Sequence, residues 1–586
     1  MITRRTVCQR IERGWRAIPF VAALFASLAA FACESATPAA ELVFTGGRIH
    51  TVDAALPEAQ AFAVRDGRFV FVGSNAGAQA WIGADTRVIP LDGRLVLPGF
   101  IDAHVHPLSG YGLQLDGVTT VKDVFDRIGA YAASHPDEAW IEGYGWDLTV
   151  FPARGPRRES LDSLVPDRPA LIWGGDGHSA WANSRALAAA GITRTTPNPD
   201  GGRIERNADG SPSGTLREAA ATMAERVVPP WSLDKRLAAL DRSLASMARF
   251  GITGFLDASI DDDAMLEVYR EAARRGMLAA HARVSIAIPR ESEALDLAAT
   301  VERARTLRES VAPFDDLDAN TVKIFVDGVI EAGTAAMLEP YAGTDGDRGE
   351  MLRSPATLDS LARRFHEAGF QLHFHAIGDR AIRSVLDAID GAGIRADSSG
   401  PGPGRPLIAH AQLVDPADVP RFARLGATPV FSALWAYADS YIRDLTIPRL
   451  GPERSRWIYP IGTLLAAGSP IAMGSDWPVT SMDPLRAIEV AVTRIDPAFP
   501  SDSGVAFLPG ERINVESAIA AYTLGSARAT LMDSVTGSIT SGKRADFIVL
   551  SDDLFAIEPG RIADVRVLLT MFSGREVYRD PDWREQ

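Results

Sequence analysis

Eight short apolar segments recur along the chain, and this recurrence limits the fold more than any other feature of the sequence. The segments occupy residues 98–106, 251–259, 278–287, 321–328, 371–379, 407–414, 427–433 and 470–476. Amphipathic stretches such as 358–368 lie between them. Buried apolar strands that alternate with helices pair in parallel, the helices cover the sheet, and eight such units close a barrel. We therefore predict an α/β fold, a (β/α)8 TIM-like barrel.

Two further parts are expected around this barrel. The first two apolar segments are about 145 residues apart, so we predict an insertion after barrel strand 1, at about 108–230, over the barrel mouth. Short strands with glycine turns occur near both ends of the chain, which predicts one small β-sandwich formed by both ends. The predicted boundaries are 41–97 for its first part, 98–500 for the barrel, and 501–586 for the last barrel helix region and the second part of the sandwich.

The first 32 residues do not fit this fold. Five arginines precede an apolar segment at 18–32 that is too short and alanine-rich for a membrane span, which is typical of a secretory signal peptide. A small-x-small cleavage pattern at 30–32 is followed directly by Cys33, although the lipobox match is poor. We expect an exported protein that is periplasmic, secreted or lipid-anchored at Cys33, with no membrane-spanning segment in the mature chain.

Charge and cysteine content exclude several classes of partner and site. Loss of residues 1–32, with five arginines and one glutamate, would change the formal net charge from −15 to −19. Such an acidic surface disfavours nucleic acid and anionic membranes as partners. Cys8 and Cys33 are the only cysteines, so the mature chain can form no internal disulfide and a metal site must use nitrogen and oxygen ligands.

Polar side chains fall at or near the ends of several predicted strands. Alternation along a strand puts Asp102, His104 and His106 on one face. The same reasoning gives Lys323 with Asp327, His373 with His375, and then His410 and Asp476 on later strands. A lone buried histidine is ordinarily a core residue that its neighbours satisfy. Five strands that supply such groups to the carboxyl end of one barrel instead favour an active site.

Imidazole nitrogen and carboxylate oxygen together suit zinc or a similar divalent ion. A protonated Lys323 would be repelled by a dication, so the amine must lie away from the metal or lose its charge. If it captured carbon dioxide, the resulting carbamate would be an anion able to bridge two ions.

Five motifs, in this order, resemble the metal-dependent amidohydrolase superfamily, specifically the amidohydrolase-3 or YtcJ-like branch that includes N-substituted formamide deformylases. The motifs are GFIDAHVHP (99–107), TVKIFVDGVIEAGTAAMLEPY (321–341), LHFHAIGDRA (372–381), IAHAQLV (408–414) and GSDWPV (474–479). The resemblance covers nearly everything after the signal, including GSITSGKRADFIVL (537–550), which completes a β-sandwich in this family.

The resemblance also implies a set of site residues. It implies a small-molecule substrate and places one or two divalent ions, with zinc expected, on His104, His106, Lys323, His375, His410 and Asp476. Superfamily members differ in whether they hold one or two metals, so carboxylation of Lys323 stays open. His373 is expected to support a ligand or to pack in the core. In the insertion, Trp146, Asp147 and His178 either contact substrate or merely fold their turns. The segment 201–218 resembles a family turn and is assigned no chemistry.

The implied activity is hydrolysis of carbon–nitrogen bonds other than peptide bonds, such as amides, formamides or cyclic amides. The metal would acidify a water and polarise the carbonyl, and Asp476 would accept the proton and pass it to the leaving nitrogen. A lactone, ester or phosphoester hydrolase at the same site is one alternative. A degenerate barrel that only binds a ligand is another. No G-x-S-x-G elbow or P-loop is present to compete.

Overall fold

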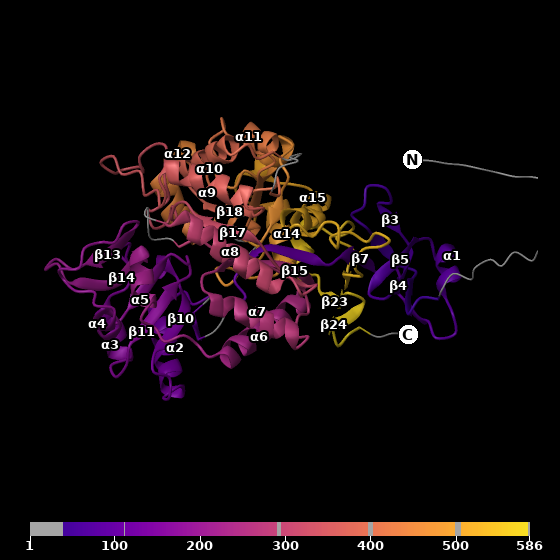
Figure 1. Ribbon diagram of the computed structural model, residues 1–586, viewed down its shortest axis with the longest axis horizontal. Helices are drawn as coiled ribbons and strands as arrows, with labels where there is room; N and C mark the ends of the chain where they lie inside the picture. Colours follow the sequence, from indigo (N-terminus) through magenta and orange to yellow (C-terminus); the bar gives the residue numbers. More distant parts are fainter. Residues whose placement is uncertain are drawn as a thin grey trace, which may run out of the picture.

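A barrel of eight parallel strands forms the centre of the molecule. The computed structural model describes residues 39–109, 112–115, 117–289, 295–395, 402–498 and 505–583 (Figure 1). The barrel strands, in spatial order, are β21 (Ala472–Met473), β20 (Thr428–Phe431), β19 (Leu407–His410), β18 (Gln371–Ala376), β17 (Leu317–Phe325), β16 (His281–Ala287), β15 (Ile252–Ile260) and β8 (Phe100–Val105). These are the eight predicted segments in sequence order, so the barrel prediction is confirmed.

The first and last strands approach each other closely enough to bring their ends together. The backbone N–H of Asp476, just after β21, donates to the carbonyl oxygen of His104 on β8 at 2.7 Å. A Cβ on Gly474 would lie 2.6 Å from the backbone nitrogen of His104, so only glycine allows this approach. Residues almost four hundred positions apart therefore meet at one rim of the barrel.

Helices lie around the barrel (Figure 1). Most of their buried apolar residues share one core cluster with those of the strands. These helices are α6 (Leu233–Arg249), α7 (Asp263–Arg274), α8 (Leu297–Val311), α9 (Pro355–Glu367), α10 (Asp379–Gly391), α11 (Val419–Leu425), α12 (Ile447–Arg454), α13 (Ile461–Ala466), α14 (Pro484–Thr493), α15 (Val515–Ala520) and α16 (Ser526–Ala529). In α10, Ile382, Val385, Leu386 and Ile389 recur at helical spacing and are all buried. None of the helices in the described ranges combines the length and apolarity needed to cross a membrane.

The insertion after β8 forms its own sheet and lies to the lower left in Figure 1. Its strands, in spatial order, are β13 (Gly202–Arg206), β14 (Pro212–Glu218), β12 (Ser179–Ala182), β11 (Ala170–Gly174), β10 (Ile141–Trp146) and β9 (Leu113–Gln114). Its helices are α2 (Val121–Ser134), α3 (Arg158–Leu164), α4 (Ser184–Ala189) and α5 (Ala219–Glu225). This sheet brings the motifs around residues 146 and 178 onto one scaffold.

Both ends of the described chain build a β-sandwich. One sheet contains β5 (Arg68–Gly73), β4 (Ala61–Arg65), β1 (Leu42–Thr45) and β6 (Arg87–Pro90). The other contains β24 (Arg575–Arg579), β23 (Val567–Phe572), β22 (Phe547–Leu550), β7 (Leu95–Pro98), β2 (Arg48–His50) and β3 (Glu58–Ala59). The ring of Phe547 lies 5.0 Å from that of Phe44 and 4.8 Å from that of Phe62, so the two ends share one aromatic core. The predicted signal segment 1–32 and Cys33 lie outside the described residues.

A buried histidine joins the base of the barrel to the sandwich. His281, at the start of β16, has Nδ1 at 2.9 Å from Asp316 Oδ1 and Nε2 at 2.9 Å from Asp546 Oδ2. Burial lowers the pKa of His281, but the carboxylates of Asp546 and Asp316 outweigh it and leave the pKa above the ordinary value of 6.5. The ring therefore holds a proton in the folded state at pH values where it would lose it in the unfolded chain.

Replacing His281 by glutamine is expected to lower the free energy of unfolding by about 3 kcal/mol at about pH 6, because the buried carboxylate of Asp546 loses its cationic partner. The contribution of the histidine is complete below its unfolded pKa of 6.5 and is lost as the pH rises through its raised folded pKa. Urea unfolding of both proteins should therefore give a difference that shrinks toward about pH 9. A difference independent of pH would contradict the charged pairing.

Candidate metal centre

Three buried side chains from different strands converge where the barrel closes. His104 lies on β8, His410 ends β19, and Asp476 follows β21. One nitrogen or oxygen atom of each lies within 4.8 Å of those of the other two, an arrangement that could hold a metal ion. His104 Nε2 is 3.4 Å from Asp476 Oδ1, and His410 Nδ1 is 3.8 Å from Asp476 Oδ2. All three are among the residues for which the sequence predicts metal binding.

Two other predicted ligands border this group. His106, one residue beyond the end of β8, has Nε2 at 3.1 Å from Asp476 Oδ1. His375 on β18 has its ring centre 4.7 Å from the ring centre of His410. Lys323 on β17 is almost completely buried. The structure therefore places His106 and His375 at the border of the group, and Lys323 opposite His373 in the pairing of β17 with β18.

The charge states in this cluster are those that bind a cation. Burial, and after it the ammonium of Lys323, lowers the pKa of His104 to about 3. Burial also lowers the pKa of His410 well below its usual range. Burial would raise the pKa of Asp476, but the neighbouring imidazoles, His104 first among them, hold it well below its usual range. Neutral imidazoles with free lone pairs and an ionised carboxylate are the forms that metals require.

Two further observations fit a metal at this point. Nδ1 of His410 is buried and has no hydrogen-bond partner among the described residues, which is costly unless something else satisfies it. His410 and Asp476 also have φ angles of 73° and 55°, a left-handed conformation that non-glycine residues rarely adopt. Such strain persists where the surrounding structure imposes a particular side-chain direction. The donor set of two imidazoles and a carboxylate matches the ligands of zinc.

Residues behind His104 fix the orientation of its backbone and its ring. Asp102 accepts hydrogen bonds from the backbone N–H groups of His104 and Ser475 and from the Ser475 hydroxyl, which ties β8 to the segment after β21. His104 Nδ1 lies 3.1 Å from His373 Nε2, and His373 Nδ1 lies 2.9 Å from Ser285 Oγ. If His104 binds metal through Nε2, its Nδ1 carries the proton, and this N–H donates a hydrogen bond to Nε2 of His373. These contacts are what the supporting role, one of the two alternatives predicted for His373, requires.

Carboxylates accompany the remaining histidines. Asp257 Oδ1 lies 4.0 Å from His106 Nδ1, and Asp257 Oδ2 accepts a hydrogen bond from Tyr269 at 2.6 Å. Asp327 Oδ1 lies 3.5 Å from His375 Nδ1, and Asp327 accepts three backbone N–H groups from two neighbouring loops. A carboxylate behind a metal-binding imidazole sets its tautomer and orientation.

The insertion residues predicted near the substrate occupy different environments. Trp146 is fully buried in the insertion, and its indole N–H donates to the carbonyl of Ile172 at 3.0 Å. Asp147 caps the short helix that follows, accepting from the backbone N–H of Thr149 at 2.7 Å. These contacts match the interpretation that both residues fold their turns. The ring of His178, in contrast, lies 4.9 Å from the ring of His375 and therefore borders the metal centre.

Sequence reasoning missed several of these residues. Asp257 lies near the end of the predicted barrel strand 251–259, so the rule that identified the other residues near strand ends could have found it. Ser285 faces the same interior as His373, but a lone serine on a strand carries no comparable signal. Glu218, which contacts His178, lies 40 positions away on another strand. Pairing between those strands, which sequence alone does not give, brings the two together.

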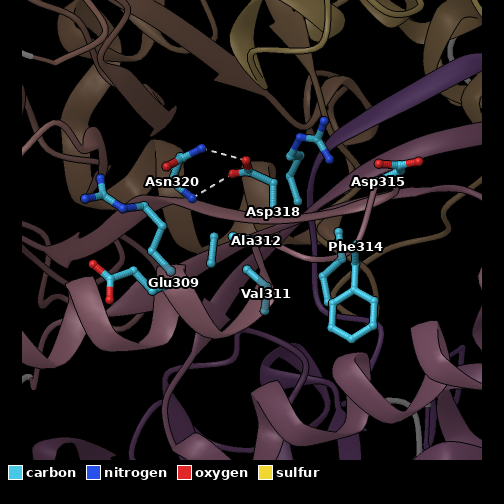
Figure 2. A pocket seen from close by; sticks show the side chains of 11 residues that line it. Glu309, Val311, Ala312, Phe314, Asp315, Asp318 and Asn320 are labelled. Atoms are coloured by element: carbon cyan, nitrogen blue, oxygen red, sulfur yellow. Dashed lines mark hydrogen bonds between the residues drawn. The ribbon is translucent and has the colours of Figure 1, made fainter.

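A cavity of about 320 Å³ lies elsewhere, near the amino end of β17 (Figure 2). Its lining includes Arg283, Arg308, Phe314, Asp318 and Asn320, and Figure 2 shows Asn320 hydrogen-bonded to Asp318. The histidines and aspartate of the metal centre are at the carboxyl ends of the strands and do not line it. Catalytic sites of barrels occupy the carboxyl end, so this cavity carries no part of the assignment.

A parallel eight-stranded barrel with a His-His-Asp group at the carboxyl ends of its strands has the architecture of a metal-dependent hydrolase. Comparison with known proteins agrees with this class. The model of the amidohydrolase family Amidohydro_3 matches residues 87–578. The chain therefore belongs to the amidohydrolase family and is a hydrolase that acts on carbon–nitrogen bonds.

Individual relatives cover almost the whole chain. YtcJ of Bacillus subtilis (strain 168) is 32% identical over 92% of this chain and 99% of its own length. The N-substituted formamide deformylase of Arthrobacter pascens is 29% identical over 91% of this chain and 97% of its own. The crystal structure of an uncharacterised metal-dependent hydrolase from Pyrococcus furiosus has a TM-score of 0.66 at 25% identity, covering 87% of this chain and 99% of that one. The YtcJ-like branch predicted from the motifs is confirmed.

Proposed function

We propose that this protein hydrolyses a carbon–nitrogen bond of a small non-peptide substrate, an N-formyl amine, another N-acyl amine or a cyclic amide, at a zinc centre with one or two ions. The observation that carries the proposal is the convergence of His104, His410 and Asp476 within 4.8 Å at the barrel mouth. The similarity to a relative named as an N-substituted formamide deformylase supports the choice of formamides among these substrates.

In this proposal His104, His106, His375, His410 and Asp476 hold the metal, with Lys323 beside them. A divalent ion bound there lowers the pKa of water toward about 7 and polarises a carbonyl group. Asp476 is buried and ionised, and it accepts the proton of the attacking water. It then delivers that proton to the leaving nitrogen, so the same side chain binds the ion and moves the proton. No serine or cysteine nucleophile takes part.

The experiment that tests the function is metal analysis coupled to a substrate panel. The zinc-loaded protein is offered N-formyl amines, N-acyl amines, cyclic amides, lactones, esters and phosphotriesters. Turnover of at least one amide, lost on chelation and restored by zinc, supports the proposal. Turnover confined to lactones, esters or phosphotriesters would replace it by the alternative hydrolase. Metal content below about 0.2 per chain would support a ligand-binding barrel without catalysis.

We propose further that Lys323 is carboxylated and that the chain is exported after cleavage behind residue 32. Lys323 is almost completely buried. Burial in general disfavours a charged ammonium, which supports loss of the charge as a carbamate. Native mass spectrometry of protein from the producing cell should show a chain starting at Cys33, with or without lipid, and heavier by one carbon dioxide. An intact residue 1 would contradict export, and a mass without the increment would contradict carboxylation.

A further inference from the structure

A histidine–glutamate pair connects the insertion with the metal centre. His178, just before β12, and Glu218, the last residue of β14, are both buried. His178 Nδ1 lies 2.7 Å from Glu218 Oε2, and the backbone N–H of Glu218 donates to the carbonyl of His178 at 2.8 Å. Asp176 accepts the backbone N–H groups of His178 and Ser179, which fixes the turn that presents the imidazole. The imidazole is thus held from two sides.

Glu218 reaches the barrel through its other oxygen. Thr334 Oγ1, in the loop that follows β17, donates to Glu218 Oε1 at 2.8 Å and accepts the backbone N–H of Val329 at 3.0 Å. A Cβ on Gly328 would lie 2.4 Å from Glu218 Oε1 and 2.2 Å from Thr334 Oγ1. Because residue 328 is glycine, the carboxylate of Glu218 can approach Thr334 in the loop that follows β17. The pair therefore spans both parts of the molecule.

Two features of the His178–Glu218 pair are energetically unfavourable, the backbone conformation of Glu218 and the burial of the two side chains. Glu218 has a φ angle of 50°, which is unfavourable for a residue with a side chain. Burying a carboxylate and an imidazole together also costs solvation that their attraction repays only with good geometry. Costs of this kind collect where a side chain must point in a required direction. Here that direction brings the ring of His178 to 4.9 Å from the ring of His375, a predicted metal ligand.

We infer that Glu218 is a positioning residue that holds His178 at the metal centre, where the imidazole contacts the substrate. This inference rests on the proposed function for the substrate and on the observed contacts for the positioning. It gives the insertion a direct part in catalysis. It also assigns a positioning role to Glu218. The sequence alone predicts no chemical role for the segment 201–218, in which this residue lies.

The test compares His178→Asn, Glu218→Gln and the double variant with the wild type, all loaded with zinc. We expect kcat/KM for the best amide to fall about 10²-fold in His178→Asn, as for loss of an active-site hydrogen-bonding group. Glu218→Gln should cost about 10-fold to 100-fold, as loss of a supporting partner does. In the His178→Asn background, Glu218→Gln should cost less than about 3-fold, because its effect passes through the imidazole. Metal content should stay unchanged in all variants.

Glu218→Gln keeps the volume of the side chain. A control variant shows whether a general loss of stability alone lowers kcat/KM. His281→Gln breaks another buried histidine–carboxylate contact, at the base of the barrel, and should leave kcat/KM of the folded protein unchanged. Equal losses from Glu218→Gln with and without His178 would overturn the inference, because they would show a role independent of the imidazole.

A crystal structure of zinc-loaded Glu218→Gln separates this inference from the proposed function. The positioning role requires the ring of His178 to turn or move away from His375 in that variant. If the wild type hydrolyses no substrate of the panel, the proposed function fails, yet the structure still decides the positioning role. An unmoved ring in the variant would overturn the inference whatever the substrate is.

Discussion

Replacement of Asp476 by asparagine is expected to lower kcat/KM for the best amide by at least about 10³-fold, because a base that transfers protons is itself worth about 10²-fold to 10⁴-fold. The carboxylate has two tasks in the proposed mechanism, and asparagine can perform neither well. Its amide accepts no proton at neutral pH, and it removes the anion from a group that holds two neutral imidazoles. The measurement is steady-state hydrolysis at saturating zinc, with metal content determined on the same samples.

Asp483 supplies a matched control for this substitution. It is seven residues further along the chain, and its carboxylate caps α14 by accepting the backbone N–H of Leu485 at 3.0 Å. Asparagine caps helices as well as aspartate does, so Asp483→Asn should keep both stability and activity. If Asp476→Asn retained more than about a tenth of the wild-type kcat/KM with full metal content, Asp476 would not be the proton carrier.

The barrel could be predicted because its strands are buried on both faces and so remain visible as apolar runs. Polar residues inside such runs stand out, and period-two alternation tells which of them share a face. His104 and His106 are found in this way, and so is His410 at the end of its strand. The rule that barrels work at the carboxyl ends of their strands then collects residues that are far apart in sequence.

The alternation of side chains along a strand shows which residues share a face, but not which residues of other strands they contact. Contacts between strands therefore could not be predicted from the sequence. The contacts of His104 with His373 (3.1 Å) and of His373 with Ser285 (2.9 Å) join β8, β18 and β16. These strands are not neighbours in the sheet, so the contacts depend on how the barrel closes. Trp146 shows the same limit inside the insertion. Its indole meets the carbonyl of Ile172 because β10 pairs with β11 in parallel, which the segment alone does not reveal. A motif that resembles an active-site segment therefore locates a turn without telling which of its side chains face the substrate.

The insertion also changes how the domains relate to function. The sequence predicts that the insertion lies over the barrel mouth, and its contacts bring His178, held by Glu218, next to His375. β12 and β14 pair antiparallel, with Ser179 opposite Arg217, which sets His178 beside Glu218. A substrate that enters between barrel and insertion would therefore meet groups from both. Changes in this sheet should alter catalysis as well as selectivity, because rigid elements hold a catalytic group more accurately than loops do.

Substitution of His104 by alanine is expected to weaken zinc binding by far more than 100-fold, whereas His373→Ala should weaken it by only about 10-fold to 100-fold. The two rings are 3.1 Å apart at their nearest nitrogens and both are buried, so the removed volume and the surroundings are closely matched. What differs is their position. His104 Nε2 faces Asp476 at 3.4 Å, whereas His373 contacts Ser285 through one nitrogen and His104 through the other.

Zinc affinity is measured by competition with chelators of graded strength, followed by elemental analysis, so the result does not depend on knowing the substrate. His135→Ala, which removes a ring stacked on Tyr131 in the insertion, should bind zinc like the wild type. If His373→Ala lost as much affinity as His104→Ala, His373 would have to be a ligand itself. If His104→Ala kept wild-type affinity, His104 would not be a ligand, which would contradict an ion held jointly by His104, His410 and Asp476.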